Sequence, residues 1–353
     1  MNLSENIVIL EANIISANST NSSHAVEDVL VSESLRRLID IVFVVVFCSV
    51  LSVFGIAANI INILVFYKQG LTSTVNIGFM ALAISDLCGL LTLEWYCICF
   101  NPLFSNNPRV PFVSTEIHHL TAGLPHSCFV RITAWITVYM TAEKCLCIVS
   151  PLKIKRIITV RTTTLVLASI SLVIVLALVP EYINAYFDWK FYPEFNRTVV
   201  GLVFRTDQPA LNGLTFLLYS IIMITSFPSV IIFTAILVFF LRRQTKWRKR
   251  STLHDNKTEA LTQRDRVATA TVMTIATVLI VTLTPSFIFF TIGFFVPGFS
   301  VTGKYRELFL TLASFVLCAD AANSSVGVIL YYRMSSRYRQ TFHELFSVCR
   351  LQK

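Results

Sequence analysis

The chain has 353 residues, of which 55% are hydrophobic and only 14% are charged. Soluble domains carry about 25% charged residues, so this composition excludes an ordinary soluble fold and indicates a membrane protein. The formal net charge is +9. We nevertheless expect no nucleic-acid partner, because most lysines and arginines fall in segments that a membrane topology places on the cytoplasmic side.

Residues 1–40 are polar and acidic, and they lack the basic start and continuous apolar run of a cleavable signal peptide. We expect them to form an extracellular N-terminal segment. Asn-X-Ser/Thr sequons, which are glycosylated only on the translocated side, support this orientation. The candidate glycosylation sites are Asn2, Asn18 and Asn21 in this segment and Asn196 further along the chain.

Seven apolar segments are each long enough to cross the hydrocarbon layer, which needs roughly 20 helical residues. They are expected at about 41–67, 74–100, 119–149, 162–182, 211–241, 266–296 and 307–332. The odd number places the N-terminus outside and the basic tail inside, in agreement with the excess of Lys and Arg expected there. The sequence therefore predicts an all-α, multi-pass protein of the plasma membrane, with a seven-transmembrane helix bundle over residues 41–332.

Polar residues inside the first two helices are the first candidates for a site. Gly55 and Asn59 stand four residues apart, which allows close helix packing and a cross-helix hydrogen bond. Asp86 follows Leu82-Ala83-Ile84-Ser85 near mid-membrane, where a carboxylate is costly and so indicates function. The alternative is that Asp86 and Asn59 form a structural hydrogen-bond centre.

The later helices carry charged and helix-bending residues near their cytoplasmic halves. The third ends with Glu143-Lys144-Cys145, and the seventh contains Asn323-Ser324 and Tyr331. Pro228 and Pro285 lie within the fifth and sixth helices, where each removes a backbone donor and is expected to act as a hinge.

The chain ends with residues 333–353, which we expect to form an amphipathic eighth helix and a cytoplasmic tail. Residues 334–346 place their aromatic and leucine side chains on one side, which is typical of a helix lying on membrane lipid. Cys349 just beyond is a candidate for palmitoylation.

These motifs, taken in order, resemble the rhodopsin-like (class A) G-protein-coupled receptors over the whole membrane span. Glu143, Lys144 and Cys145 stand where that family has Asp/Glu-Arg-Tyr, and Gly327-Val328 replaces its Asn-Pro. Cys-Leu-Cys after Lys144, Pro-Leu-Lys-Ile-Lys, and Asn-Ser-Ser with Tyr331-Tyr332 are similar to molluscan chemosensory receptors. A neuropeptide receptor of the same fold is the alternative.

The resemblance implies that an extracellular ligand, a small molecule or a peptide, shifts the bundle toward a form that binds a heterotrimeric G protein as the sixth helix moves outward. The switch residues would be Glu143, Lys144, Cys145, Pro228, Pro285 and Tyr331. Lysine at 144 keeps the charge of the family's arginine but loses its bidentate geometry. The alternative is that Lys144 merely reaches to interfacial water.

The same resemblance narrows the ligand. His126 stands where amine receptors carry an aspartate, and Ala321 stands where opsins carry the retinal lysine, so amines are disfavoured and a visual pigment is excluded. We expect a ligand pocket lined by His126, Arg131, Glu181 and Asp320, in which Arg131 binds an acidic group. An internal ion pair between Arg131 and Glu181 is the alternative.

Two further features follow from the comparison with the family. Asp86, Thr133, Asn323 and Ser324 match its sodium pocket, although Gly327 and Leu283 depart from it; no other cofactor is expected. The family's usual disulfide to the second external loop is absent, because residues 183–210 contain no cysteine and His119 stands near the other expected position. Packing, a glycan on Asn196, or a bridge from Cys97 or Cys99 would have to hold that loop.

Other classes of membrane protein fit less well. A transporter or channel would show inverted repeats and a polar pathway, and neither is evident in the sequence. An enzyme is not expected, since no nucleophile–base pair, metal cluster or phosphate-binding loop occurs in any segment.

Overall fold

The computed structural model describes residues 32–149, 154, 157–193, 196–205, 211, 213–248, 256–299 and 303–351. Within these ranges the side chains of 241, 244–248, 256–266 and 348–351 are not described. The predicted acceptors Asn2, Asn18 and Asn21 lie outside the described residues, and so does the side chain of Cys349.

Seven helical rods, each long and apolar enough to cross a membrane, form the molecule. The predicted seven-transmembrane bundle is therefore confirmed, and the chain is a multi-pass membrane protein. In chain order the rods consist of α2 (Glu33–Ile39), the π-helix η1 (Asp40–Cys48) and α3 (Ser49–Gln69); α4 (Thr74–Phe100); α6 (Ser114–His118), the π-helix η2 (His119–Gly123) and α7 (Leu124–Val149); α9 (Val160–Leu176) and α10 (Val179–Asn184); α11 (Leu214–Arg248); α12 (Asn256–Phe295); and α13 (Arg306–Ser325) and α14 (Gly327–Met334).

Several rods are longer than the apolar segments suggest. The first begins at Glu33 instead of 41, so the last residues of the expected N-terminal segment belong to a helix, whose start is capped by the Ser32 hydroxyl. The third begins at Ser114 instead of 119, and α11 and α12 extend past 241 and before 266. Apolar content marks the part of a helix within lipid, and it does not register polar turns beyond it.

The rods pack as a closed ring. Contacts run from α3 to α4, α4 to α7, α7 to α11, α11 to α12, α12 to α13 and α13 back to α3, while α9 packs against α4 and α7. The close approach of α3 and α13 depends on Gly55, where a Cβ atom would lie 2.3 Å from Ser325 Oγ. Pro228 and Pro285 lie inside α11 and α12, and neither proline ends its helix.

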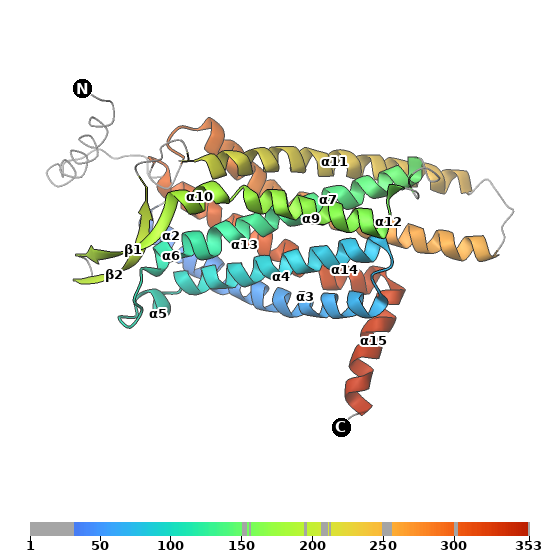
Figure 1. Cartoon of the computed structure of the whole chain (residues 1–353), viewed down its shortest axis with the longest axis horizontal. Coiled ribbons are helices and arrows are strands. Elements are labelled where there is room, and N and C mark those ends of the chain that lie inside the picture. The colour runs from blue at the N-terminus through green and yellow to red at the C-terminus, as the bar shows by residue number, and fades with distance from the viewer. Residues whose placement is uncertain are drawn as a thin grey trace.

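The cytoplasmic end of the bundle is joined to α15 (Ser336–Leu351), which runs across the direction of the other helices (Figure 1). Its Tyr338 is buried in an aromatic cluster with Phe66, Phe79 and Tyr331. This orientation is the one expected for a helix lying along the inner membrane surface.

The opposite, outer end carries a two-stranded antiparallel hairpin that the sequence did not predict (Figure 1). Strands β1 (Ala185–Tyr192) and β2 (Arg197–Phe204) pair along their full length, and the short helix α5 (Pro102–Ser105) lies at the same end. The hairpin occupies the second external loop, so it determines how that loop meets the helices below.

Candidate ligand and signalling sites

Arg131, on α7, is the most unusual charge within the membrane span. It is only 5% exposed, and its hydrogen bonds go to two backbone carbonyls, Tyr219 O at 3.3 Å and Ser127 O at 2.8 Å. The guanidinium carbon lies 4.2 Å from the ring centroid of Tyr219 and 5.1 Å from that of Phe290. These aromatic faces stabilise the cation, but among the described residues no carboxylate forms an ion pair with it.

His126 and Asp320 meet next to this position. His126 Nδ1 lies 3.0 Å from Gly89 O, while Nε2 lies 3.7 Å from Asp320 Oδ2, beyond hydrogen-bond distance. Within the described part of the chain Nε2 has no hydrogen-bond partner, although the side chain is 3% exposed. Asp320 Oδ1 accepts a long hydrogen bond of 3.4 Å from Ser286 Oγ. Among the described residues, the pair therefore leaves His126 Nε2 without a hydrogen bond in the bundle core.

Glu181 does not join this group, contrary to the expected four-residue pocket. It lies at the start of α10, and its Oε1 is 3.1 Å from Nε2 of His119. The alternative ion pair between Arg131 and Glu181 is likewise not formed in the structure. Glu181 instead connects α10 to the outer part of the third rod, next to the hairpin, which begins at Ala185.

The hairpin is held to the third rod by a carboxylate, and the expected disulfide position is not used. Glu116 Oε2 accepts hydrogen bonds from the Tyr192 hydroxyl and from Leu202 N, both at 2.8 Å. Burial and the Glu116 carboxylate raise the pKa of Tyr192 to about 12, so the phenol stays a donor at neutral pH. Gly201 makes the close approach feasible, since a Cβ atom there would lie 1.9 Å from the Tyr192 oxygen.

Backbone pairing adds to this clamp. Val113 N donates to Val200 O at 2.9 Å, and Val200 N donates to Pro111 O at 3.0 Å. The residues before α6 thus run beside β2 as a short parallel bridge. Of the three arrangements considered for this loop, packing against the third rod is the one observed, and the described cysteines form no disulfide.

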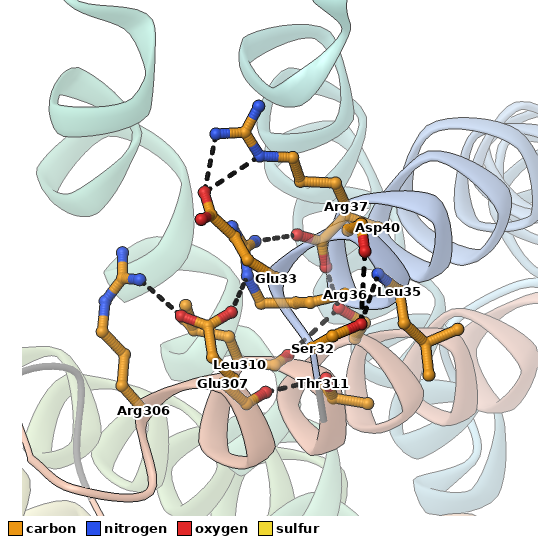
Figure 2. A network of polar contacts seen from close by, with 12 residues as sticks. Ser32, Glu33, Leu35, Arg36, Arg37, Asp40, Arg306, Glu307, Leu310 and Thr311 are labelled. Atoms are coloured by element: carbon orange, nitrogen blue, oxygen red, sulfur yellow. Dashed lines mark hydrogen bonds and ion pairs between the residues drawn. The ribbon is translucent and has the colours of Figure 1, made fainter. Parts of the chain in front are cut away.

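A polar network closes the outer end between the first and seventh rods (Figure 2). Arg36 contacts Asp40 of its own rod and Glu307 of α13, each at 2.5 Å. Arg36 and Asp40 are largely buried, whereas the neighbouring Arg37–Glu33 pair is exposed. The buried pairs therefore orient α2 against α13, while the exposed pair contributes little.

Asp86 lies at the centre of the mid-membrane polar cluster. Its Oδ1 accepts from Thr133 Oγ1 at 2.9 Å and from Ser324 Oγ at 3.1 Å. Asn323 faces the same cavity of about 20 Å³, although its own Oδ1 accepts from Thr282 Oγ1 at 3.1 Å. That volume suffices for one water or a small ion, and the polar atoms of Asp86, Thr133 and Asn323 that line it are mainly oxygens.

Asn59 is joined to Asp86 through Ser324 and makes no direct bond with it. Asn59 Nδ2 donates to Ser324 O at 2.7 Å and to Gly55 O at 2.9 Å. Its Oδ1 accepts from Asn62 Nδ2 at 3.2 Å, and Asn62 Oδ1 in turn accepts from Tyr338 OH at 2.6 Å. A chain of hydrogen bonds thus runs from mid-membrane to α15.

At the cytoplasmic end, Lys144 is paired with its neighbour. Lys144 Nζ lies 3.1 Å from Glu143 Oε1, and the same oxygen accepts from Thr74 Oγ1 of α4 at 2.7 Å. Both side chains are buried in the bundle. Cys145 Sγ contacts Phe233 O of α11 at 3.2 Å, which ties the third rod to the fifth.

A cavity of about 760 Å³ opens next to this pair. Its lining includes Thr74, Phe79, Thr271, Tyr331, Arg337 and Tyr338. It therefore involves α4, α12, α14 and α15, and Tyr331 forms part of its wall.

A family model described as "Serpentine type 7TM GPCR chemoreceptor Srw" matches residues 45–349. The chain belongs to the Srw chemoreceptor family. The match runs from η1 in the first membrane rod into α15, and no curated protein matches the chain. The Srw match favours a receptor over the transporter or channel considered from the sequence.

Sequence reasoning missed several residues of this Srw receptor. Tyr219 and Phe290 surround Arg131 from helices distant in the chain, and no local pattern marks them. Glu116 carried a weak signal as a lone acidic residue just before the expected third helix, but the loop it holds was not predicted as a hairpin. Of the predicted acceptor sites, Asn196 is described; it is exposed at the hairpin turn with φ of 48°.

Proposed function

We propose that this Srw receptor binds a chemosensory ligand with an acidic group at Arg131. The observation that carries the proposal is a buried guanidinium without a carboxylate partner among the described residues. An unpaired charge in the membrane interior is costly, and a ligand anion would supply the missing partner. His126 Nε2 and Asp320 offer additional polar groups for the rest of the ligand.

The test uses cells that express the receptor with a promiscuous G protein and a panel of carboxylic acids, each matched with its methyl ester. We expect acids to activate and esters to fail. Arg131→Ala should abolish the response at unchanged surface expression, and Arg131→Lys should keep part of it, since it retains the charge. Equal responses of wild type and Arg131→Ala would overturn the assignment of Arg131.

The same assay separates the alternative receptor class. Peptides with free or amidated carboxyl termini form a second panel, and a response confined to peptides would favour a neuropeptide receptor. Transport or current that needs no G protein would instead favour a transporter or channel.

The proposal for the cytoplasmic side follows the rhodopsin-like pattern, with similarity to molluscan chemosensory receptors. Ligand binding would swing the part of α12 below Pro285 outward and enlarge the cavity beside Tyr331, so that a heterotrimeric G protein can bind. Pro228 would allow a smaller adjustment of α11. The pair Glu143–Lys144 would separate in this step, leaving Lys144 to contact the G protein.

Lys144→Arg provides the test of this switch. Arginine keeps the charge and adds a bidentate fork, so agonist-stimulated nucleotide exchange should be preserved or raised. Lys144→Met, which keeps the length without the charge, should lower exchange. A clear loss with arginine would show that the switch needs lysine specifically and would contradict the proposed equivalence.

We propose further that Asp86, Thr133, Asn323 and Ser324 bind a sodium ion in the inactive receptor. The oxygen ligands and the small cavity support this. An absence of any sodium effect on agonist potency would count against it.

A further inference from the structure

The seam between the first and seventh rods carries several polar and aromatic contacts in the outer half of the bundle. Below the Arg36–Glu307 pair (Figure 2), Ser314 Oγ donates to Asp40 Oδ1 at 2.7 Å. The rings of Phe43 and Phe315 meet edge to face at 4.6 Å. These contacts hold η1 and α13 in one register along the seam.

Two thiols face each other at the lower end of this seam. Cys48 Sγ and Cys318 Sγ lie 3.1 Å apart, and Cys318 Sγ also lies 3.2 Å from Phe43 O. A disulfide bond measures about 2.05 Å, so the sulfur atoms need to approach by only about 1 Å. Both residues are placed by packed helices that are 270 positions apart in the chain.

The position within the membrane makes oxidation feasible. Cys97, which packs in the same cluster as Cys48, lies one turn from the outer end of α4 at Phe100. The thiols therefore lie in the outer half of the bundle, the half nearer the oxidising side of the membrane. Cys48 is fully buried, whereas Cys318 is partly exposed and can meet an external reagent first.

We propose that Cys48 and Cys318 form a reversible disulfide that ties the first membrane helix to the seventh. The oxidant is a small-molecule disulfide. The Cys318 thiol loses its proton to solvent, and its thiolate attacks one sulfur, forms a mixed disulfide and releases one small thiolate. The Cys48 thiol then attacks the Cys318 sulfur and passes its proton to the second small thiolate as that group leaves. Two protein thiols and one disulfide thus become one protein disulfide and two small thiols.

The cross-link joins two positions that are 270 residues apart. It prevents α13 from sliding against η1. It fixes the outer half of α13 against η1 at the level where the two contact, while the cytoplasmic ends remain unlinked. Reduction restores the freedom of α13 to move along this seam. Cys318 precedes Asp320 of the candidate ligand site by two residues on α13, but formation of the disulfide does not depend on the function proposed above.

The experiment detects the bond in the full-length receptor. A protease site is inserted between Arg248 and Asn256, and membranes are treated with 2,2′-dipyridyl disulfide. Remaining thiols are blocked with N-ethylmaleimide, and the folded receptor is then cleaved and run on a non-reducing gel. The C-terminal fragment contains only Cys318 and Cys349, so any covalent link between the fragments must use one of them.

We expect the two fragments of the oxidised wild type to migrate as one band that a reductant separates. Cys318→Ser and Cys48→Ser should each abolish that band. Cys349→Ser and Cys97→Ser are the matched controls, and both should retain it. Absence of the band in wild type, or its persistence in Cys318→Ser or Cys48→Ser, would overturn the proposal.

A second measurement does not depend on how the variants fold. Oxidised, alkylated wild type is digested, and the peptides are analysed by mass spectrometry. A peptide containing Cys48 joined to one containing Cys318 is the expected product. Alkylation of both cysteines in the oxidised sample would contradict the inference.

Discussion

Ser324 connects two polar residues that the sequence suggested separately. Its hydroxyl donates to Asp86 and its carbonyl oxygen accepts from Asn59. One residue of α13 therefore joins α4 and α3 at mid-membrane. A displacement of Asp86 would alter its hydrogen bond to Ser324 and, through Ser324, the hydrogen bond to Asn59. Asp86 can be interpreted either as a functional carboxylate or as a structural hydrogen-bond centre, and the two interpretations are compatible. The same oxygens that form the hydrogen bonds also surround the small cavity.

Asp86→Asn tests the ionic part of this arrangement. Asparagine keeps an oxygen that can accept from Thr133 and Ser324, but it removes the charge that would attract sodium. We expect sodium chloride, compared with N-methylglucamine chloride at equal ionic strength, to lower agonist potency a few-fold in wild type because sodium stabilises the inactive state. The shift should vanish in Asp86→Asn. A sodium effect of equal size in both would exclude Asp86 as the ligand.

At the scale of single elements, the outer hairpin and α15 are each anchored to the bundle by side-chain bonds. The hairpin depends on Glu116, which accepts hydrogen bonds from a side chain of β1 and from a backbone amide of β2. Helix α15 depends on Tyr338, whose hydroxyl reaches Asn62 inside the bundle. The Tyr338 anchor is buried and the Glu116 anchor is partly buried, so removing one partner should cost more than the bond itself, most of all at Tyr338.

Glu116→Ala should detach the hairpin. Loss of the acceptor leaves Leu202 N without its partner, at a cost of about 1–3 kcal/mol. We expect faster proteolysis between β1 and β2 and a weaker ligand response. Asp188→Ala, an exposed change on β1, is the matched control and should leave both unchanged. Equal proteolysis of the two variants would show that backbone pairing with 111–113 holds the hairpin alone.

Tyr338→Phe should destabilise the cytoplasmic end. It leaves Asn62 Oδ1 buried without the Tyr338 donor, at a cost of about 1–3 kcal/mol, seen as a lower thermal unfolding midpoint in detergent. Tyr332→Phe is the matched control, because its hydroxyl contacts His343 in an exposed position. Its midpoint should stay within experimental error of wild type. If both variants unfolded alike, the bond from Tyr338 to Asn62 would not anchor α15.

At the scale of the whole molecule, the sequence allowed the bundle to be predicted because long apolar segments have one stable form in lipid, a helix. The eighth helix followed from its one-sided apolar pattern. The hairpin did not, because its position depends on contacts with 111–113 and Glu116, which no local pattern in 185–204 indicates. Arg131 and Asp86 could be singled out as costly charges, but the aromatic faces around Arg131 and the attachment of Glu181 to His119 depend on distant parts of the chain.

Asn196→Gln tests the orientation of the whole bundle. Asn196 is exposed at the hairpin turn and begins the sequon Asn-Arg-Thr, so it should carry a glycan if the hairpin lies outside. The variant should migrate faster by the size of one glycan, and Thr198→Ala should reproduce the shift. Unchanged migration of both variants would contradict glycosylation at this turn.

Because a carboxylate holds the hairpin, the attachment of this loop does not depend on the redox conditions around the receptor. An external loop fastened by a disulfide comes loose in water rich in sulfide or other thiols, where such bonds are cleaved. The bonds of Glu116 to Tyr192 and Leu202 contain no sulfur. The attachment of the outer hairpin should therefore persist in reducing, thiol-containing surroundings that would cleave a disulfide.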